Sequence, residues 1–207
     1  TSSMKYIVLA KSDREPGVYF LFDEEAMNFK PIAFTYENLD PNHMAEVRPV
    51  YYEARDGLTI PAYLTLPKGS DGKNLPTVIL PHGGPYARDS MEFHYLPQFI
   101  ANRGYAVLQP NFRGSTGYGT EFFEAGHQQW GLAMQDDVTD GTKWLIDGGI
   151  ADPNRICIVG WSYGGFAALM GAVKEPELYT CSVSINGVSD VKRLLADTRN
   201  TVGSTCR

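Results

Sequence analysis

The sequence has little cysteine, little histidine and a deficit of positive charge. Its 207 residues include three cysteines and four histidines, and 18 Lys and Arg stand against 24 Asp and Glu, which leaves a net charge of −6. Proteins that bind nucleic acids or anionic membrane surfaces present basic residues to the phosphates. The charge therefore argues against both kinds of partner. No apolar run approaches the ~20 residues that a membrane-spanning helix needs.

The cysteines and histidines are also spread too thinly for a metal site. Structural zinc sites cluster these residues at short spacings, and disulfide frameworks use an even number of cysteines. Because neither pattern is present, we expect no metal, no cofactor and no disulfide framework, with Cys157 and Cys181 as buried thiols. The state of Cys206, next to the last residue, stays open. These residues include no signal peptide, and both a cytoplasmic and a periplasmic location stay open.

The first 45 residues are expected to form a short β segment and a linker. Three β-prone runs lie at residues 6–10, 18–22 and 31–36. They predict one hairpin and a trailing strand, which is too little for an independent core. Residues 38–48 are polar and contain the turn signal Pro41-Asn42, so they predict a linker. Residues 46–207 then form the main domain.

In the main domain, short apolar runs alternate with helical patterns. Strands are expected at 50–54, 59–66, 77–80, 106–108, 156–159 and 182–185. Apolar residues follow helical spacing at 93–100, 138–145 and 166–173. Buried strands that alternate with helices predict an α/β fold with a parallel sheet.

The strongest functional signal is the segment GWSYGG at 160–165. It contains G-x-S-x-G between a predicted strand and a predicted helix, which is the context of a nucleophile elbow. In such a turn the serine is exposed at the carboxyl end of the sheet, while side chains at the two glycine positions would collide with their neighbours. We therefore predict that Ser162 is a nucleophile and that the Tyr163 amide points toward the same spot. The alternative is a glycine-rich turn with an incidental serine.

A second signal, the segment HGGP at 82–85, directly follows a predicted strand. In α/β-hydrolases the loop at this place supplies the second donor of the oxyanion hole, and glycines leave the backbone N–H groups open to the substrate. A plain β-turn is the alternative. We expect His82 to hold this loop rather than to act as the base, because the catalytic His of this fold follows the nucleophile. All four histidines here precede Ser162.

The third signal is the loop NFRGSTGYG at 111–119. It lacks the Gly-Lys-Ser/Thr of a P-loop, and Phe122 stands where a dinucleotide-binding motif has its last glycine, so nucleotide binding is not expected. We predict instead a conformationally demanding loop beside the active site, which Arg113 ties down through hydrogen bonds.

Together, these three segments resemble the prolyl oligopeptidase family of serine peptidases, and the resemblance extends from about Pro49 to Val191. The most similar branch contains the acylaminoacyl peptidases and bacterial dipeptidyl-peptidase-like members. Prolyl oligopeptidase itself carries a Tyr where this chain has His82, whereas a histidine is usual in the acylaminoacyl-peptidase branch.

The resemblance implies an α/β-hydrolase domain that cleaves short peptides through an acyl-enzyme on Ser162. By the same match, the backbone N–H groups of Tyr163 and Gly84 form the oxyanion hole, and His82, Gly83 and Arg113 support its loops. In this family a β-propeller covers the hydrolase domain, so residues 1–45 are expected to be the end of a propeller and a linker.

The acid and base of the family's triad are missing from the expected places. They follow the nucleophile in the family, but the residues after Ser162 contain Asp190, Asp197 and no histidine. We therefore expect an incomplete hydrolase domain that is a poor enzyme alone and whose partners are the rest of that domain and the propeller. An open sheet edge at 182–185 predicts association between copies. An esterase of the same fold and a non-catalytic, truncated chain stay open as alternatives.

Overall fold

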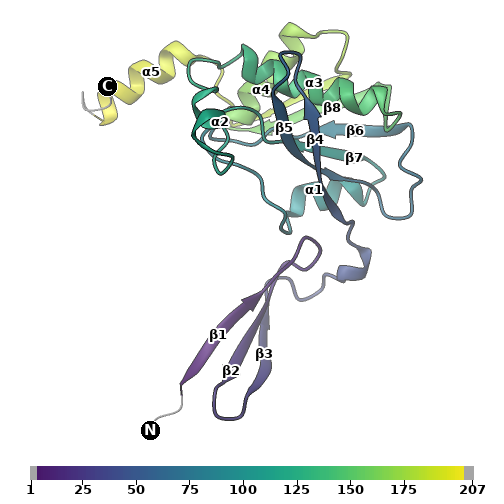
Figure 1. The fold of residues 1–207 in the computed structure, drawn as a ribbon, viewed down its shortest axis with the longest axis vertical. Coiled ribbons are helices and arrows are strands. Elements are labelled where there is room, and N and C mark those ends of the chain that lie inside the picture. The colour runs from purple at the N-terminus through teal and green to yellow at the C-terminus, as the bar shows by residue number, and fades with distance from the viewer. Residues whose placement is uncertain (1–3, 203–207) are drawn as a thin grey trace.

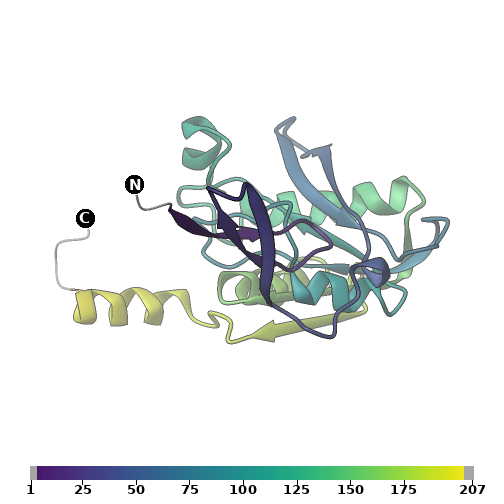
Figure 2. The ribbon, with the colours of Figure 1, turned by 90° about the horizontal axis from the view of Figure 1, so that it is seen from below.

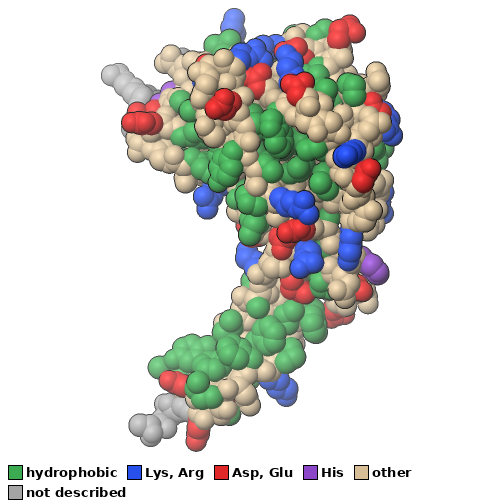
Figure 3. Space-filling view, turned by 45° about the vertical axis from the view of Figure 1, so that its right-hand side comes forward, with side chains coloured by type: hydrophobic (Ala, Val, Ile, Leu, Met, Phe, Trp, Pro, Cys, Tyr) green, Lys and Arg blue, Asp and Glu red, His purple; other side chains and the backbone are tan. Residues whose placement is uncertain are grey.

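The computed structural model describes residues 4–202, which form two separate sheets (Figure 1). The first is an antiparallel sheet of three strands in the order β1 (Lys5–Ala10), β2 (Val18–Asp23) and β3 (Asn28–Phe34). The predicted hairpin and trailing strand thus form one continuous sheet. It projects from the larger part of the chain and has apolar side chains on its surface (Figure 3).

The linker after β3 is a short 3₁₀ helix, η1 (Pro41–His43), which Asp40 caps by accepting a hydrogen bond from the Asn42 N–H. Gln98 in the first α-helix anchors the chain on both sides of η1. Its side chain accepts from the Ala45 N–H at 2.9 Å and donates to the carbonyl groups of Ala45 and Asp13. The predicted linker is therefore an ordered segment that packs on the main domain.

The second sheet has six strands in the order β4-β5-β7-β6-β8-β9. The strands are β4 (Val47–Glu53), β5 (Thr59–Thr65), β6 (Leu75–Ile79), β7 (Ala106–Pro110), β8 (Ala151–Trp161) and β9 (Cys181–Ile185). Strands β7, β6, β8 and β9 are parallel, as expected, whereas the β4–β5 hairpin joins β7 in antiparallel pairing. The sheet is therefore mixed, with β9 at one edge.

The described residues form five α-helices: α1 (Tyr95–Ala101), α2 (Thr120–Glu124), α3 (Ala133–Asp147), α4 (Tyr163–Lys174) and α5 (Val191–Val202). Three of them cover the two faces of this sheet. Helices α3 and α4 lie on one face and α1 on the other (Figure 1). Seen from below, β9 runs along the edge of the sheet and α5 extends away from it (Figure 2). The helix α2 was not anticipated from the sequence.

The core lies between the sheet and the α3–α4 layer. Ile156 and Ile158 of β8 are fully buried, as are Val138 on α3 and Ala168 on α4. Small residues on α4 let that helix approach the sheet closely. The opposite face of β8 and β9 is more open, and Val183 there is 44% exposed.

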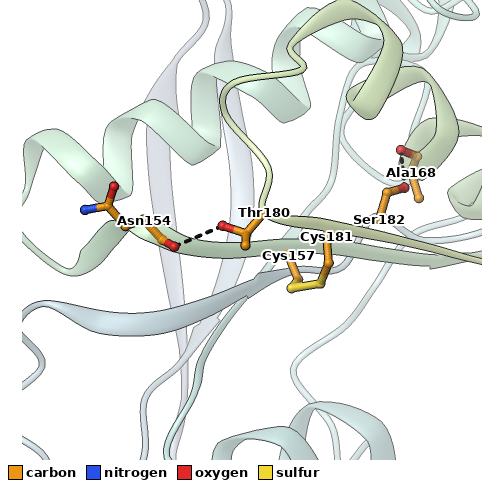
Figure 4. The surroundings of a disulfide bond; sticks show 6 residues. All are labelled: Asn154, Cys157, Ala168, Thr180, Cys181 and Ser182. Carbon is orange, nitrogen blue, oxygen red and sulfur yellow. Dashed lines mark hydrogen bonds between the residues drawn. A yellow bond between two sulfur atoms is a disulfide. The ribbon is translucent and has the colours of Figure 1, made fainter.

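The two cysteines on this open face form a disulfide bond, Cys157–Cys181 (Figure 4). The prediction of two buried thiols and no disulfide is therefore wrong. The two residues are direct partners in the parallel β8–β9 pair, with 4.6 Å between their Cα atoms, so both side chains leave the sheet on the same face. Cys157 is only partly buried and Cys181 is exposed. Cys206 lies outside the described residues.

Two absences concern residues 4–202, the part of the chain that the structure describes. No helix there is both long and apolar enough to cross a membrane. Within the same residues, no group of three or more His, Cys, Asp or Glu side chains is arranged to hold a metal ion.

Candidate active site

Ser162 lies at a sharp turn between β8 and α4. Its backbone has φ 54° and ψ −117°, a left-handed conformation that is rare for a residue with a side chain. The turn requires glycine on both sides. A Cβ at Gly160 would overlap the backbone of Gly164, and one at Gly164 would overlap the carbonyl group of Pro81. The strand, the turn and the helix are thus packed backbone against backbone, and the loop after β6 packs against the same turn.

The HGGP loop lies directly beside Ser162. A Cβ built on Gly83 would lie 3.5 Å from the Cβ of Ser162 and 3.2 Å from the Trp161 carbonyl oxygen. Gly84 has a φ of +125°, which only glycine adopts readily, and the Gly84–Pro85 peptide bond is cis. Tyr163 is the first residue of α4, so its N–H belongs to the free amino end of a helix. The fold therefore brings the two segments with predicted oxyanion donors together.

His82 is held inside this loop by three contacts. Its ring stacks on Phe112 at 4.4 Å between centroids, Nδ1 lies 2.8 Å from the Gly83 carbonyl oxygen, and Nε2 lies 2.8 Å from Ser115 Oγ. Burial lowers the pKa of His82 to about 4, so the ring is neutral at pH 7. The Ser115 hydroxyl also donates to the Phe112 carbonyl oxygen at 2.6 Å, which links the His82 ring to the loop that begins at Asn111. Both nitrogens are thus occupied in fixing the loop.

Arg113 joins three distant segments. It donates from its backbone N–H and Nε to Asp137 Oδ2, both at 2.9 Å, and from one terminal nitrogen to Asp137 Oδ1 at 2.7 Å. Its guanidinium also donates to both oxygens of Asp56, at 2.7 and 3.0 Å. Asp137 is fully buried, and its carboxylate raises the pKa of Arg113. Arg113 therefore forms hydrogen bonds to two distant acidic residues, while its support of an active-site loop stays a prediction.

The sequence indicated Arg113 but neither of its partners. Asp137 lies on the inward face of α3, between the buried Met134 and Val138, and an acidic residue at such a position was an available signal. The Arg113 guanidinium holds the pKa of Asp56 at about 2, mainly through its hydrogen bonds, so Asp56 is ionised at pH 7.

The elbow is also held from the side of β9, which sequence reasoning missed. The Ser162 N–H donates to the Ile185 carbonyl at 3.1 Å, and the Val188 N–H donates back to the Ser162 carbonyl at 3.4 Å. Gly165 packs so closely on Gly187 that a Cβ on either would press against the other's backbone. The end of β9 and the segment after it therefore also hold the serine turn.

The four histidines lie elsewhere than at the serine hydroxyl. His43 is in η1, His94 caps α1 by accepting from the Leu96 N–H, and His127 packs against Tyr86 in an aromatic cluster. Within residues 4–198, no histidine or carboxylate contacts the Ser162 hydroxyl through a hydrogen bond. This part of the chain thus contains the elbow and its loops without an acid–base pair at the serine.

The two aspartates after the serine have local roles. Asp190 precedes α5 and accepts from the Arg193 N–H at 2.9 Å, which is a helix-capping contact. Asp197 forms an ion pair with Arg193 one turn earlier on α5. Neither contact places a carboxylate beside a histidine.

Comparison with known proteins identifies the family. A profile described as the prolyl oligopeptidase family matches residues 91–204, more than half of the chain. The chain belongs to the prolyl oligopeptidase family. It is 38% identical over 198 residues to dipeptidyl aminopeptidase BIII of Pseudoxanthomonas mexicana, a match that covers 92% of this chain and 29% of the relative. It is 30% identical to the acylamino-acid-releasing enzyme of Sus scrofa, over 95% of this chain and 26% of that enzyme.

The fold agrees with solved members. A puromycin-hydrolyzing peptidase of Mycobacterium tuberculosis superposes with a TM-score of 0.78 at 26% identity, over 90% of this chain and 30% of that one. The 207 residues thus span less than a third of the relatives described here. The predicted resemblance to the family is confirmed.

Proposed function

We propose that Ser162 is the nucleophile of a serine peptidase that cleaves short peptides through an acyl-enzyme. The observation that carries the proposal is the backbone of Ser162, held at φ 54° between β8 and α4 with the Gly83 loop against its side chain. Holding a serine in a strained turn costs free energy, and such strain is concentrated at functional sites. The similarity to aminopeptidases and acylamino-acid-releasing enzymes supports peptides as the substrates.

In this proposal, the N–H groups of Tyr163 and Gly84 stabilise the oxyanion of the tetrahedral intermediate. One such donor lowers the barrier by about 3 kcal/mol. His82 and Arg113 fix the loops that carry these donors. Residues 46–207 then form the first part of an α/β-hydrolase domain, and residues 1–45 form the end of a β-propeller with its linker. The triad acid and base would come from the part of the protein outside these 207 residues.

Labelling of the complete protein with a fluorophosphonate tests the nucleophile. We expect Ser162→Ala to abolish labelling and the hydrolysis of acylaminoacyl or dipeptidyl anilides, whereas Ser189→Ala, a substitution of a nearby exposed serine, should leave both intact. Labelling that survives Ser162→Ala would contradict the assignment. The 207-residue chain alone should label poorly, because a serine without a base is a weak nucleophile.

Two alternatives predict other outcomes of the same assays. An esterase of this fold would hydrolyse simple esters efficiently and aminoacyl anilides poorly. A non-catalytic protein would leave both substrates unchanged even in its complete form, and its natural mass would be near the 22.9 kDa of this chain.

A further inference from the structure

The loop at 111–119 is joined to the HGGP loop and to the residues that follow it. The Thr116 N–H donates to the Ala87 carbonyl at 2.9 Å. The Asn111 side chain holds the backbone of Asp89 on both sides, because it accepts from the N–H at 2.8 Å and donates to the carbonyl at 3.2 Å. Two irregular segments are thus fastened to each other by hydrogen bonds.

A serine hydroxyl makes a further connection between the two loops, next to the elbow. Ser115 Oγ lies 2.8 Å from His82 Nε2 and donates to the Phe112 carbonyl at 2.6 Å. On its other side, the His82 ring contacts the Gly83 carbonyl, and a Cβ on Gly83 would lie 3.5 Å from the Cβ of Ser162. A chain of contacts therefore runs from the loop at 111–119 through Ser115 to the segment beside the nucleophile.

These connections lie in the interior of the domain. Asn111, Phe112 and Ser115 are fully buried by residues that the structure describes, and any further part of the protein could only bury them more. The Arg113 side chain, one position after Phe112, directs its hydrogen bonds to carboxylates in α3 and in the turn between β4 and β5. Arg113 thus ties the loop at 111–119 to the domain, while Asn111 and Ser115 tie the HGGP loop to it.

We propose that Ser115 is a positioning residue for the Gly84 N–H, with Asn111 as a second anchor of the same loop. Gly84 has a φ of +125° and no side chain of its own to hold it in place. A donor stabilises an oxyanion only within hydrogen-bond distance, and a displacement of about 1 Å in a catalytic group can cost about 100-fold in rate. This role rests on the proposed function, whereas the fastening of the loop does not.

Kinetics of the complete protein on an acylaminoacyl or dipeptidyl anilide test the role in catalysis. Ser115→Ala should lower kcat and kcat/KM equally, by about 10- to 100-fold, because the Gly84 N–H acts only on the oxyanion. Asn111→Ala should act in the same direction. The matched control is Thr142→Val, which removes another fully buried hydroxyl that donates to a backbone carbonyl, here on α3, and should leave both constants unchanged.

Hydrogen exchange on the same variants tests the fastening of the loop without any assay of catalysis. In Ser115→Ala, exchange should rise about tenfold in peptides covering 82–89 and stay unchanged in β8, which is a local opening. Thr142→Val should leave exchange at 82–89 unchanged. If Ser115→Ala does not fold, Ser115→Cys takes its place, because a thiol is of similar size and forms only weak hydrogen bonds.

The outcomes separate this proposal from the proposed function. Unchanged kcat in Ser115→Ala, or a loss that appears only as a raised KM, would overturn the positioning role, and so would unchanged exchange at 82–89. Hydrolysis that survives Ser162→Ala would instead contradict the proposed function. In that case, exchange at 82–89 would still decide whether Ser115 holds the loop.

Discussion

In the six-stranded sheet, Ile60, Ile79 and Ile158 are fully buried, whereas in the three-stranded sheet Ile7 is 70% exposed and Phe29 is 57% exposed. Both sheets consist of apolar, β-prone sequence, so strand propensity alone does not explain the difference. The helices α1, α3 and α4 pack against strands of the larger sheet. Figure 3 shows the apolar surface that the smaller sheet retains. Strand formation and core formation are therefore separate requirements, and only the larger sheet meets both within these residues.

The larger sheet also differs in its polar connections. Asp137, Gln98 and Arg113 are buried side chains that each join segments far apart in the sequence. Such groups are costly to bury and must be fully paired, so removing one partner has a large effect. Substitutions in this region should therefore cost far more stability than substitutions of similar chemistry outside it. In the 207-residue chain, we expect the largest loss of stability at Asp137 and the smallest in the three-stranded sheet.

Asp137→Ala should produce the greatest loss. It leaves the Arg113 guanidinium largely buried without its main partner, which typically costs about 3–5 kcal/mol of unfolding free energy. Urea denaturation measures the change. Glu46→Ala is the matched control, because its ion pair with Arg48 is exposed on both sides and should contribute at most about 1 kcal/mol. Equal losses in the two variants would contradict the assigned role of Asp137.

Gly164→Ala should come next, with a loss of about 2–3 kcal/mol. The added methyl group would overlap the Pro81 carbonyl, so either the elbow or the loop after β6 must move. Gly149→Ala serves as control. A Cβ there meets nothing within 4 Å, and the cost should be limited to about 1 kcal/mol for its positive φ. Denaturation by urea would again be used, and a neutral Gly164→Ala would show that the packing is loose.

The elbow and its loops were predictable because their signals are local. The glycines around Ser162 and the pair Gly83-Gly84 predict tight turns. The residues within each short segment are enough to specify such a turn. The disulfide was not predictable, because it depends on the register between β8 and β9, and a shift of one residue would direct one cysteine to the opposite face. The same limit applies to Asp137, whose partners are reached only after the sheet and α3 have packed.

His82 should make the stability of the larger sheet fall in acid. In the unfolded chain this histidine takes a proton near its ordinary pKa of 6.5, whereas in the folded protein burial holds its pKa at about 4. Between these values only the unfolded state gains a proton, so stability is lost as the pH falls from 6.5 toward 4, by about 2 kcal/mol. The difference between the urea midpoints at pH 6.5 and pH 4.5 should be smaller for His82→Gln than for the unaltered chain. His127 is exposed, so His127→Gln should keep the full difference between the two midpoints. If His82→Gln also kept the full difference, His82 would not be the cause of the acid sensitivity.

The smallest effect is expected in the three-stranded sheet. Ile7→Ala removes a side chain that is 70% exposed, so little apolar surface is transferred to water and the loss should stay below about 0.5 kcal/mol. Ile60→Ala makes the same chemical change at a fully buried position and should cost about 2–5 kcal/mol, since it also leaves a cavity. The pair compares the two sheets directly in one denaturation experiment. A large loss from Ile7→Ala in this chain would mean that the three-stranded sheet is covered in solution, and the contrast between the sheets would then reflect missing contacts rather than a separate fold.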